Sequence, residues 1–140
     1  MLYKFLLSLL LIIIGTPVYS EIKMREYRDR VCYDGDTCYI IYESLPESLQ
    51  KMSIRVLGID TPEIKGNCNK EKELALEARE FANSVFKAAK SIEFKDLKWD
   101  KYGGRVLSNV YLDGKLYADL IIAKGLAKSY DGGKKISWCD

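Results

Sequence analysis

The stretch that most constrains the fold is residues 55–63, which read Arg-Val-Leu-Gly-Ile-Asp-Thr-Pro-Glu. Pro62 fixes its own φ and pushes Thr61 towards extended geometry, so an extended segment must end here in a stiff turn. An arginine inside an apolar run is costly to bury unless its charge is paired. The stretch therefore predicts a β-strand that carries Arg55 and ends by fixing the two carboxylates that follow it.

Turn signals and residue types divide the rest of the chain into short strands and two helices. Apolar residues recur every three to four positions over residues 71–90, which predicts an amphipathic helix, and a shorter helix over residues 116–124 is stopped by Gly125. The predicted strands cover residues 27–33, 37–42, 52–59, 92–97 and 105–112, with loops at 43–50 and 64–70 and a turn at 100–104. The order β-β-β-α-β-β-α predicts a mainly β fold with helices (α+β), a five-stranded OB-type barrel capped by the helices.

The N-terminal residues 1–20 differ from the rest of the chain. Lys4 precedes an apolar run, and small Ser20 closes the segment. This arrangement predicts a secretory signal peptide, because the apolar run is too short for a comfortable membrane span. An uncleaved membrane anchor is the alternative. Cleavage would send the protein to the periplasm or the medium, with no stable membrane association.

The residue types that are missing limit the chemistry. The chain of 140 residues contains no histidine, which excludes a Ser-His-Asp triad, a Cys-His pair and histidine-ligated zinc. Its formal net charge of +2 falls to +1 once the single lysine of residues 1–20 is removed. Bulk charge therefore does not indicate a nucleic-acid binder, and any attraction for phosphate must come from a local basic cleft.

Four cysteines in an exported chain favour disulfides, and three pairings are possible. Cys32 and Cys38 flank the turn between the first two strands and would face each other across a hairpin. Cys68 and Cys139 would then tie the loop after the proline turn to the C-terminus. Free, buried thiols are the alternative.

Two acidic turns supply candidate metal ligands. Asp36 lies in the hairpin turn Asp34-Gly35-Asp36, and Asp60 lies at a strand end. Hard cations bind carboxylates, backbone carbonyls and water, so both aspartates and the Thr61 carbonyl would form a water-completed Ca²⁺ site. An Asp-Gly-Asp sequence by itself is ordinarily only a turn former.

Two arginines and one glutamate complete a set suited to phosphodiester cleavage. The guanidinium of Arg55 matches two phosphate oxygens, and Arg105 opens a strand where a long side chain reaches a cleft. Glu63 is placed to activate water. Each residue taken singly is better explained by a solvated surface or an ion pair than by a site.

Four segments together resemble the staphylococcal-nuclease-like (thermonuclease) family, and the resemblance covers about residues 27–130. The segments are Val-Cys-Tyr-Asp-Gly-Asp-Thr (31–37), residues 55–63, Asp-Lys-Tyr-Gly-Gly-Arg-Val-Leu (100–107) and Gly-Leu-Ala-Lys (125–128). The resemblance implies a calcium-dependent nuclease that cleaves DNA or RNA to products with 3′-phosphates. We expect a monomer with one nuclease domain over residues 21–140, consisting of a core over 27–130 and a disulfide-pinned tail over 131–140.

The resemblance also implies roles for individual residues. Asp36 and Asp60 would bind calcium, helped by the Thr61 carbonyl, while Arg55 and Arg105 stabilise the phosphate and Glu63 acts on the attacking water. Lys101 and Tyr102 would lie near a terminal phosphate of the substrate, and Tyr130 would flank the nucleotide. Two features depart from the family pattern: an extra glycine precedes Arg105, and the long C-terminal helix of the best-known members is absent.

Two other functions compete with a nuclease. A non-catalytic nucleic-acid-binding OB-fold module would have lost part of the site, whereas every acid and arginine of the set is present. A secreted structural or adhesion domain explains neither the two acidic turns nor the arginine in the third strand.

Overall fold

The computed structural model describes residues 21–140, so the predicted signal peptide over residues 1–20 lies outside the described part of the chain. The strands are β1 (Ile22–Met24), β2 (Thr37–Tyr42), β3 (Lys51–Val56), β4 (Ile59–Asp60), β5 (Ile92–Trp99), β6 (Arg105–Leu112), β7 (Lys115–Leu116) and β8 (Lys128–Ser129). The helices are the 3₁₀ turn η1 (Glu47–Leu49), α1 (Asn69–Ala88) and α2 (Tyr117–Ala123).

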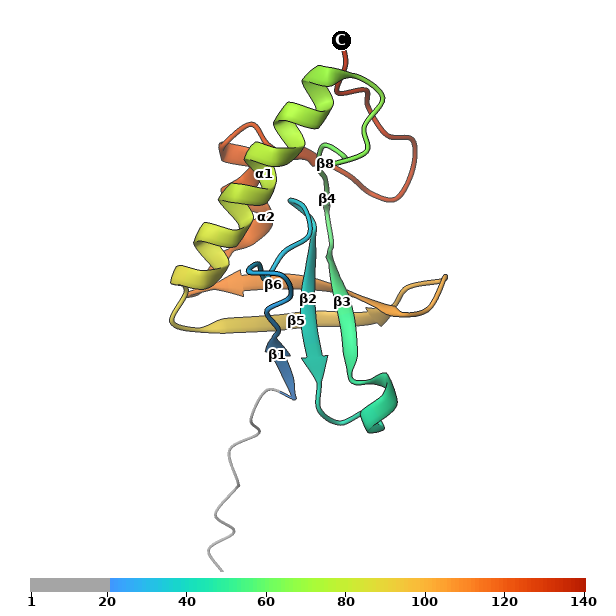
Figure 1. Cartoon of the computed structure of the whole chain (residues 1–140), viewed down its shortest axis with the longest axis vertical. Helices are drawn as coiled ribbons and strands as arrows, with labels where there is room; N and C mark the ends of the chain where they lie inside the picture. The colour runs from blue at the N-terminus through green and yellow to red at the C-terminus, as the bar shows by residue number, and fades with distance from the viewer. Residues whose placement is uncertain (1–20) are drawn as a thin grey trace, which may run out of the picture.

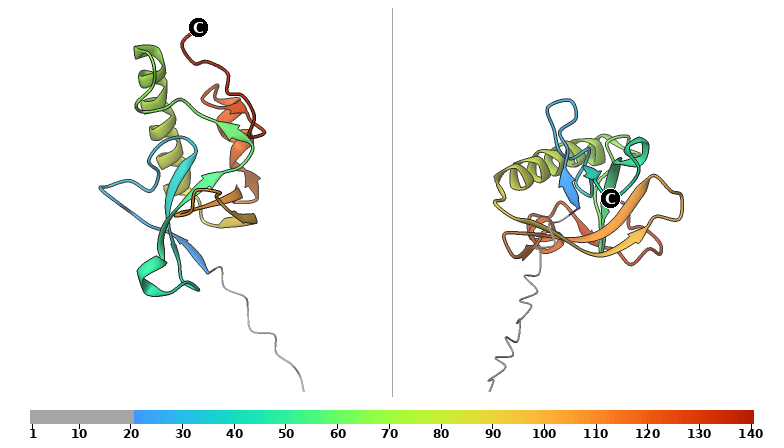
Figure 2. Two further views of the ribbon diagram at one scale, coloured as in Figure 1. Left: turned by 90° about the vertical axis from the view of Figure 1, so that its right-hand side faces the viewer. Right: turned by 90° about the horizontal axis from the view of Figure 1, so that it is seen from below.

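One curved sheet forms the body of the molecule, with strand order β1-β2-β3-β6-β5 and β7 added beside β6. The β3–β6 pair is parallel and the other pairs in this sheet are antiparallel. Both helices lie at the same end of the sheet (Figures 1 and 2). The predicted α+β fold of OB type is therefore confirmed.

The core explains why these segments form these elements. Side chains alternate between buried and half-buried along β6, as expected for a strand with one face on the core. Helix α1 buries Ala75, Ala78 and Ala82 on one face, and these small side chains allow close approach to the sheet. Gly35 uses that space: a Cβ there would lie 2.8 Å from Thr61 Cγ2 and 3.1 Å from Ala78 Cβ. The glycine of the acidic turn therefore permits close packing.

Several predicted boundaries differ from the structure. The predicted strand over residues 27–33 is wrong: Arg28 and Asp29 adopt positive φ angles of 51° and 62°, and the chain turns back on itself there. The sheet begins instead with β1, which the sequence reading missed. The predicted strand over residues 52–59 is interrupted at Gly58, whose φ of +81° turns the chain between β3 and β4.

Other boundaries shift by one or two residues. Helix α1 starts at Asn69, where the Cys68 sulfur accepts a hydrogen bond from the Glu71 amide. Helix α2 ends where predicted, with Gly125 at a φ of +72°. Both proposed disulfides, Cys32–Cys38 and Cys68–Cys139, are present.

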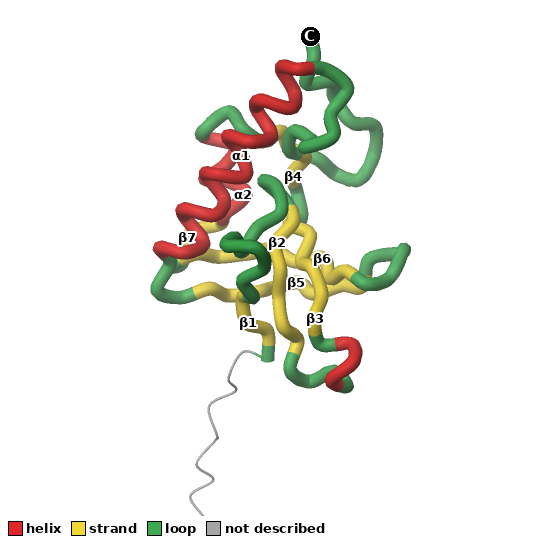
Figure 3. The backbone as a smooth tube through the Cα atoms, viewed as in Figure 1, coloured by secondary structure: helices red, strands yellow, loops and turns green. Residues whose placement is uncertain are grey.

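The disulfide Cys68–Cys139 joins two loops that lie side by side at the helical end of the molecule (Figure 3). One loop connects β4 to α1, and the other is the tail that follows β8. Within residues 21–140, every helix is too short or too polar to cross a membrane.

Candidate active site

The predicted site residues meet at one cavity of about 930 Å³ beside β3 and β6. All of them except Asp60 and Thr61 line it, namely Asp36, Arg55, Glu63, Lys101, Tyr102, Arg105 and Tyr130. They come from the acidic turn, from β3, from the proline turn, from the start of β6 and from the tail. The topology therefore gathers segments that are far apart in the sequence into one concave surface.

Asp36 is the centre of the most buried part of the site. One of its oxygens, Oδ2, accepts hydrogen bonds from the Thr61 amide (3.2 Å) and hydroxyl (2.9 Å). The same oxygen lies 3.3 Å from Nη2 of Arg55, whose side chain is only 13% exposed. The Arg55 guanidinium also donates to the carbonyls of Val56 and Ile59. Arg55 is thus held rigidly, which is how its buried charge is accommodated.

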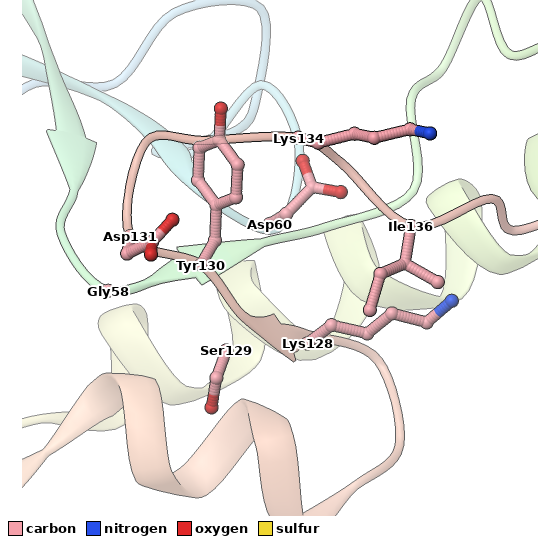
Figure 4. A pocket seen from close by; sticks show the side chains of 8 residues that line it. All are labelled: Gly58, Asp60, Lys128, Ser129, Tyr130, Asp131, Lys134 and Ile136. Carbon is pink, nitrogen blue, oxygen red and sulfur yellow. The ribbon is translucent and has the colours of Figure 1, made fainter.

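Asp60 lies under the tail, where Figure 4 shows its carboxylate beneath the loop that runs from Asp131 to Lys134. Its Oδ2 accepts a hydrogen bond from Nε1 of Trp138 at 3.3 Å, and the Lys135 ammonium lies 2.9 Å from its Oδ1. Within residues 21–140, Oδ1 is buried without a donor in hydrogen-bond geometry. Although partial burial opposes its charge, the carboxylates of Asp60 and Glu63 raise the pKa of Lys135.

Glu63 faces the cavity from a loop that a second, buried glutamate fixes. Glu71 accepts hydrogen bonds from the Glu63 amide (3.3 Å) and the Asn67 amide (2.8 Å). A Cβ on Gly66 would lie 2.6 Å from the Glu71 carboxylate, so a larger residue at this position would displace Glu71 from its contacts with the loop. The loop is also tied down by the disulfide of Cys68.

Arg105 lines the same cavity as Arg55 despite the extra glycine before it. Gly103 and Gly104 have φ angles of 73° and 66°, so the additional residue is accommodated in the turn. Asp100 then receives two contacts from Arg105, at 2.6 Å from Nε and 2.5 Å from Nη2. Although burial opposes ionisation, these hydrogen bonds lower the pKa of Asp100.

The predicted substrate-binding residues lie on the rim of the cavity. Tyr102 is 81% exposed, and the Lys101 ammonium lies 5.0 Å from its ring centroid. In the tail, the Tyr130 hydroxyl donates to the Gly133 carbonyl, and the Lys135 ammonium lies 5.8 Å from the Tyr130 ring centroid. Both tyrosines are therefore available to a ligand in the cavity.

Asp34 has the most perturbed carboxyl group at the site. Its Oδ1 accepts hydrogen bonds from the amides of Asp36 and Thr37, which closes the turn. Burial and the neighbouring Asp36 raise its pKa to about 7, with Glu63 adding to the effect. Burial and the carboxylates of Asp36 and Asp34 likewise raise the pKa of Tyr117, whose hydroxyl donates to the Gly35 carbonyl at 2.6 Å.

Replacing Asp34 with asparagine is expected to stabilise the metal-free protein at pH 8 and to change little at pH 4. The folded state binds the Asp34 proton more tightly than the unfolded chain, in which the pKa is near 3.8. Stability therefore falls as the pH rises from about 4 to about 7, and the amide avoids this loss while keeping the oxygen that accepts both turn amides. Thermal unfolding of both proteins in chelator, at pH 4 and at pH 8, measures the difference in stability. A variant that melts lower than the wild type at pH 8 would contradict the reading.

The donor set fits a hard cation. Two buried carboxylates, Asp36 and Asp60, supply the oxygen donors. Asp36 accepts a hydrogen bond from the amide of Thr61, which follows Asp60 in the chain, and a cation at Asp60 Oδ1 would take the place of the Lys135 ammonium. Oxygen donors of this type suit Ca²⁺. A second group of potential ligands, Cys68, Glu71 and Cys139, is less suitable because both sulfurs are bonded to each other.

The fold and the site together define an OB-type barrel with a carboxylate–arginine cavity on its outer surface. A family model described as "Staphylococcal nuclease homologue" matches residues 53–137. The chain belongs to this family. It is also similar to Endonuclease YncB of Bacillus subtilis (strain 168), with 34% identity over 97 residues, 68% of this chain and 43% of that protein. The chain thus spans less than half the length of this curated relative.

Three contributors to the site were missed by the sequence reading: Glu71, Lys135 and Trp138. Glu71 had a detectable signal, because it shares the buried helix face of Ala75 and Ala78. The two tail residues had only their proximity to Cys139, and their contacts with Asp60 follow from the disulfide.

Proposed function

We propose that the protein is an exported, calcium-dependent nuclease that hydrolyses phosphodiester bonds of DNA or RNA and leaves 3′-phosphates. The observation that carries the proposal is the convergence of Asp36, Arg55, Glu63 and Arg105 on one cavity, where Asp36 is hydrogen-bonded to Thr61, the neighbour of Asp60 in the chain. Membership of the nuclease homologue family and similarity to an endonuclease of Bacillus subtilis support it. The predicted signal peptide and the two disulfides support export.

The residues divide the reaction between them. Asp36 and Asp60 would hold calcium with the Thr61 carbonyl, and the bound ion would supply charge that polarises the phosphate. Arg55 and Arg105 stabilise the negative charge that grows on the phosphate oxygens. Glu63 accepts a proton from a water molecule as the water oxygen bonds to phosphorus and the P–O5′ bond breaks, and the departing 5′-oxygen takes a proton from solvent.

The rest of the cavity positions the substrate. Lys101 and Tyr102 line the cavity and are suited to a terminal phosphate, and Tyr130, which also lines it, provides a ring beside a nucleotide. The Lys135 ammonium adds positive charge next to Asp60 and Glu63. The protein is proposed to act as a monomer.

We expect the protein to digest single-stranded DNA in the presence of calcium. Digestion should stop when a chelator is added, because the carboxylates then lack the cation they are arranged to hold. Gel analysis of an end-labelled oligonucleotide measures cleavage, and removal of the new terminal phosphate by a phosphatase identifies the 3′-phosphate. Asp60→Asn, checked for folding by thermal unfolding, is the matched control and should remain inactive in calcium. Folded protein that binds DNA but does not cleave it in calcium would favour the non-catalytic binding module.

A further inference from the structure

An arginine–tyrosine patch lies outside the cavity, on the loop between β1 and β2 and on the neighbouring part of β2. We define it as Arg25, Tyr27, Arg28, Arg30 and Tyr39. The loop projects from the body of the molecule as the blue segment in Figure 2. Its tip is a tight turn in which the backbone groups of Tyr27 and Arg30 hydrogen-bond to each other at 2.8 and 3.3 Å.

The aromatic rings and guanidinium groups of the patch are stacked together. Tyr27 and Tyr39 meet edge to face with centroids 5.3 Å apart. The Arg25 guanidinium lies 5.5 and 5.3 Å from their centroids, and Arg28 lies 5.1 Å from the Tyr27 ring. Tyr27 remains 42% exposed. The patch thus presents aromatic rings and planar guanidinium cations side by side on one surface.

Residues 25–30 carry a net charge of +1, because Glu26 and Asp29 stand among the three arginines of the patch. Among residues 21–140, no carboxylate forms an ion pair with Arg25, Arg28 or Arg30. Nε of Arg25 is buried without a hydrogen-bond acceptor in the same part of the chain. Two further cations contact the loop: Arg79 donates to the Tyr33 carbonyl near the start of β2, and Lys87 donates to the Asp29 carbonyl in the turn at the tip.

The patch is continuous with the cavity along β2. Thr37 lines the cavity and is paired with Arg55, while Tyr39 lies two residues further along the same strand. Residues two apart in a strand point to the same face, so Tyr39 shares the outer face that carries Thr37. Tyr33, whose ring lies 5.3 Å from the Arg79 guanidinium, also lines the cavity, and it belongs to the segment that joins the loop to β2.

We propose that this patch binds the single-stranded part of a nucleic acid that continues beyond the cleaved phosphodiester. Unpaired bases would stack on Tyr27 and Tyr39, and the arginines would contact the phosphates between them. The inference rests on the proposed nuclease function, because that function places the nucleic acid strand in the cavity next to the patch. The patch itself is a separate binding site. Stacking needs free base faces, so a single strand fits this surface better than a duplex, whose bases are already stacked.

The test compares oligothymidylates of two lengths. Fluorescence anisotropy in chelator gives the affinities of labelled dT3 and dT12 for the wild type and for Arg25→Gln/Arg28→Gln. The double variant should bind dT12 about ten-fold more weakly and dT3 equally well, and its salt dependence for dT12 should be shallower. The matched control, Lys90→Gln/Lys115→Gln, removes the same charge from exposed positions outside the cavity and the patch, and it should bind both ligands like the wild type.

A second variant guards against misfolding. Tyr27→Ser changes a half-exposed ring and should also weaken dT12 binding without affecting dT3. Equal dT12 affinity in the wild type and both patch variants, or an equal loss for dT3, would overturn the inference. So would a dT12·dA12 duplex that depends on the patch as strongly as dT12 does.

Cleavage assays in calcium separate the inference from the proposed function. The patch variants should raise KM for dT12 and leave kcat unchanged. If the wild type binds dT12 through the patch yet cleaves nothing, the proposed nuclease function fails and the binding site stands. If the wild type cleaves and the length-dependent loss is absent, the patch fails and the nuclease proposal stands.

Discussion

Replacing Glu63 with glutamine is expected to lower the turnover number by at least about 10², the usual cost of losing a positioned proton acceptor. The amide cannot accept a proton from water, but it keeps an oxygen for the Lys135 ammonium, which lies 3.3 Å from the Glu63 carboxylate. The loop should not move, because Glu71 binds the backbone of residue 63 and not its side chain. Oligonucleotide affinity is therefore expected to change by less than about three-fold.

The matched control is Glu73→Gln, the same substitution at an exposed position on α1. It should leave turnover and affinity unchanged. Initial rates in calcium give the turnover number, and anisotropy in chelator gives the affinity. Glu63→Gln with wild-type turnover would remove Glu63 from the proposed chemistry, while a large loss of affinity with normal turnover would make it a binding residue.

The predictable part of this protein is the part that short-range patterns encode. Arg55 in an apolar run, followed by Thr61 and Pro62, indicates a strand that ends before the proline, and in the structure Arg55 lies on β3 and the extended chain ends with β4 at Asp60, after the interruption at Gly58. The alternation of buried residues along β6 and the spacing of apolar residues along α1 are likewise local. Gly125 ends α2 because its positive φ is one that glycine adopts freely.

The unpredictable part depends on contacts between distant segments. The mixture of polar and apolar residues before the Asp-Gly turn favoured a strand over residues 27–33, but Arg28 and Asp29 take left-handed conformations and form the projecting loop. Lys135 and Trp138 reach Asp60 because a disulfide brings the tail across the site. Neither spacing nor composition encodes that approach. The assignment of roles to the site residues remains a prediction that the variants described here are designed to test.

Replacing Arg55 with lysine is expected to be nearly as damaging as replacing it with alanine, with turnover lowered by about 10² to 10³ in both. The guanidinium already donates to two carbonyls and faces Asp36, so its orientation is set before substrate arrives. A lysine ammonium is a point charge. It cannot donate hydrogen bonds to both carbonyls and also offer two parallel donors to a phosphate. The effect is measured as initial rates of dT3 cleavage, because dT3 is too short to contact the arginine–tyrosine patch as well as the cavity.

Stability must be separated from catalysis, because Arg55 is also the ion-pair partner of buried Asp36. Losing one member of a buried pair is strongly destabilising, so Arg55→Ala should melt lower than Arg55→Lys, which retains a positive charge. If the rate loss were only unfolding, the lysine variant would recover activity on cooling, whereas a lost forked contact leaves it inactive while folded. Arg79→Lys is the matched control, since a lysine can keep its one hydrogen bond to the Tyr33 carbonyl. Full activity in folded Arg55→Lys would show that the site needs only a positive charge at this position and not the two parallel donors of a guanidinium.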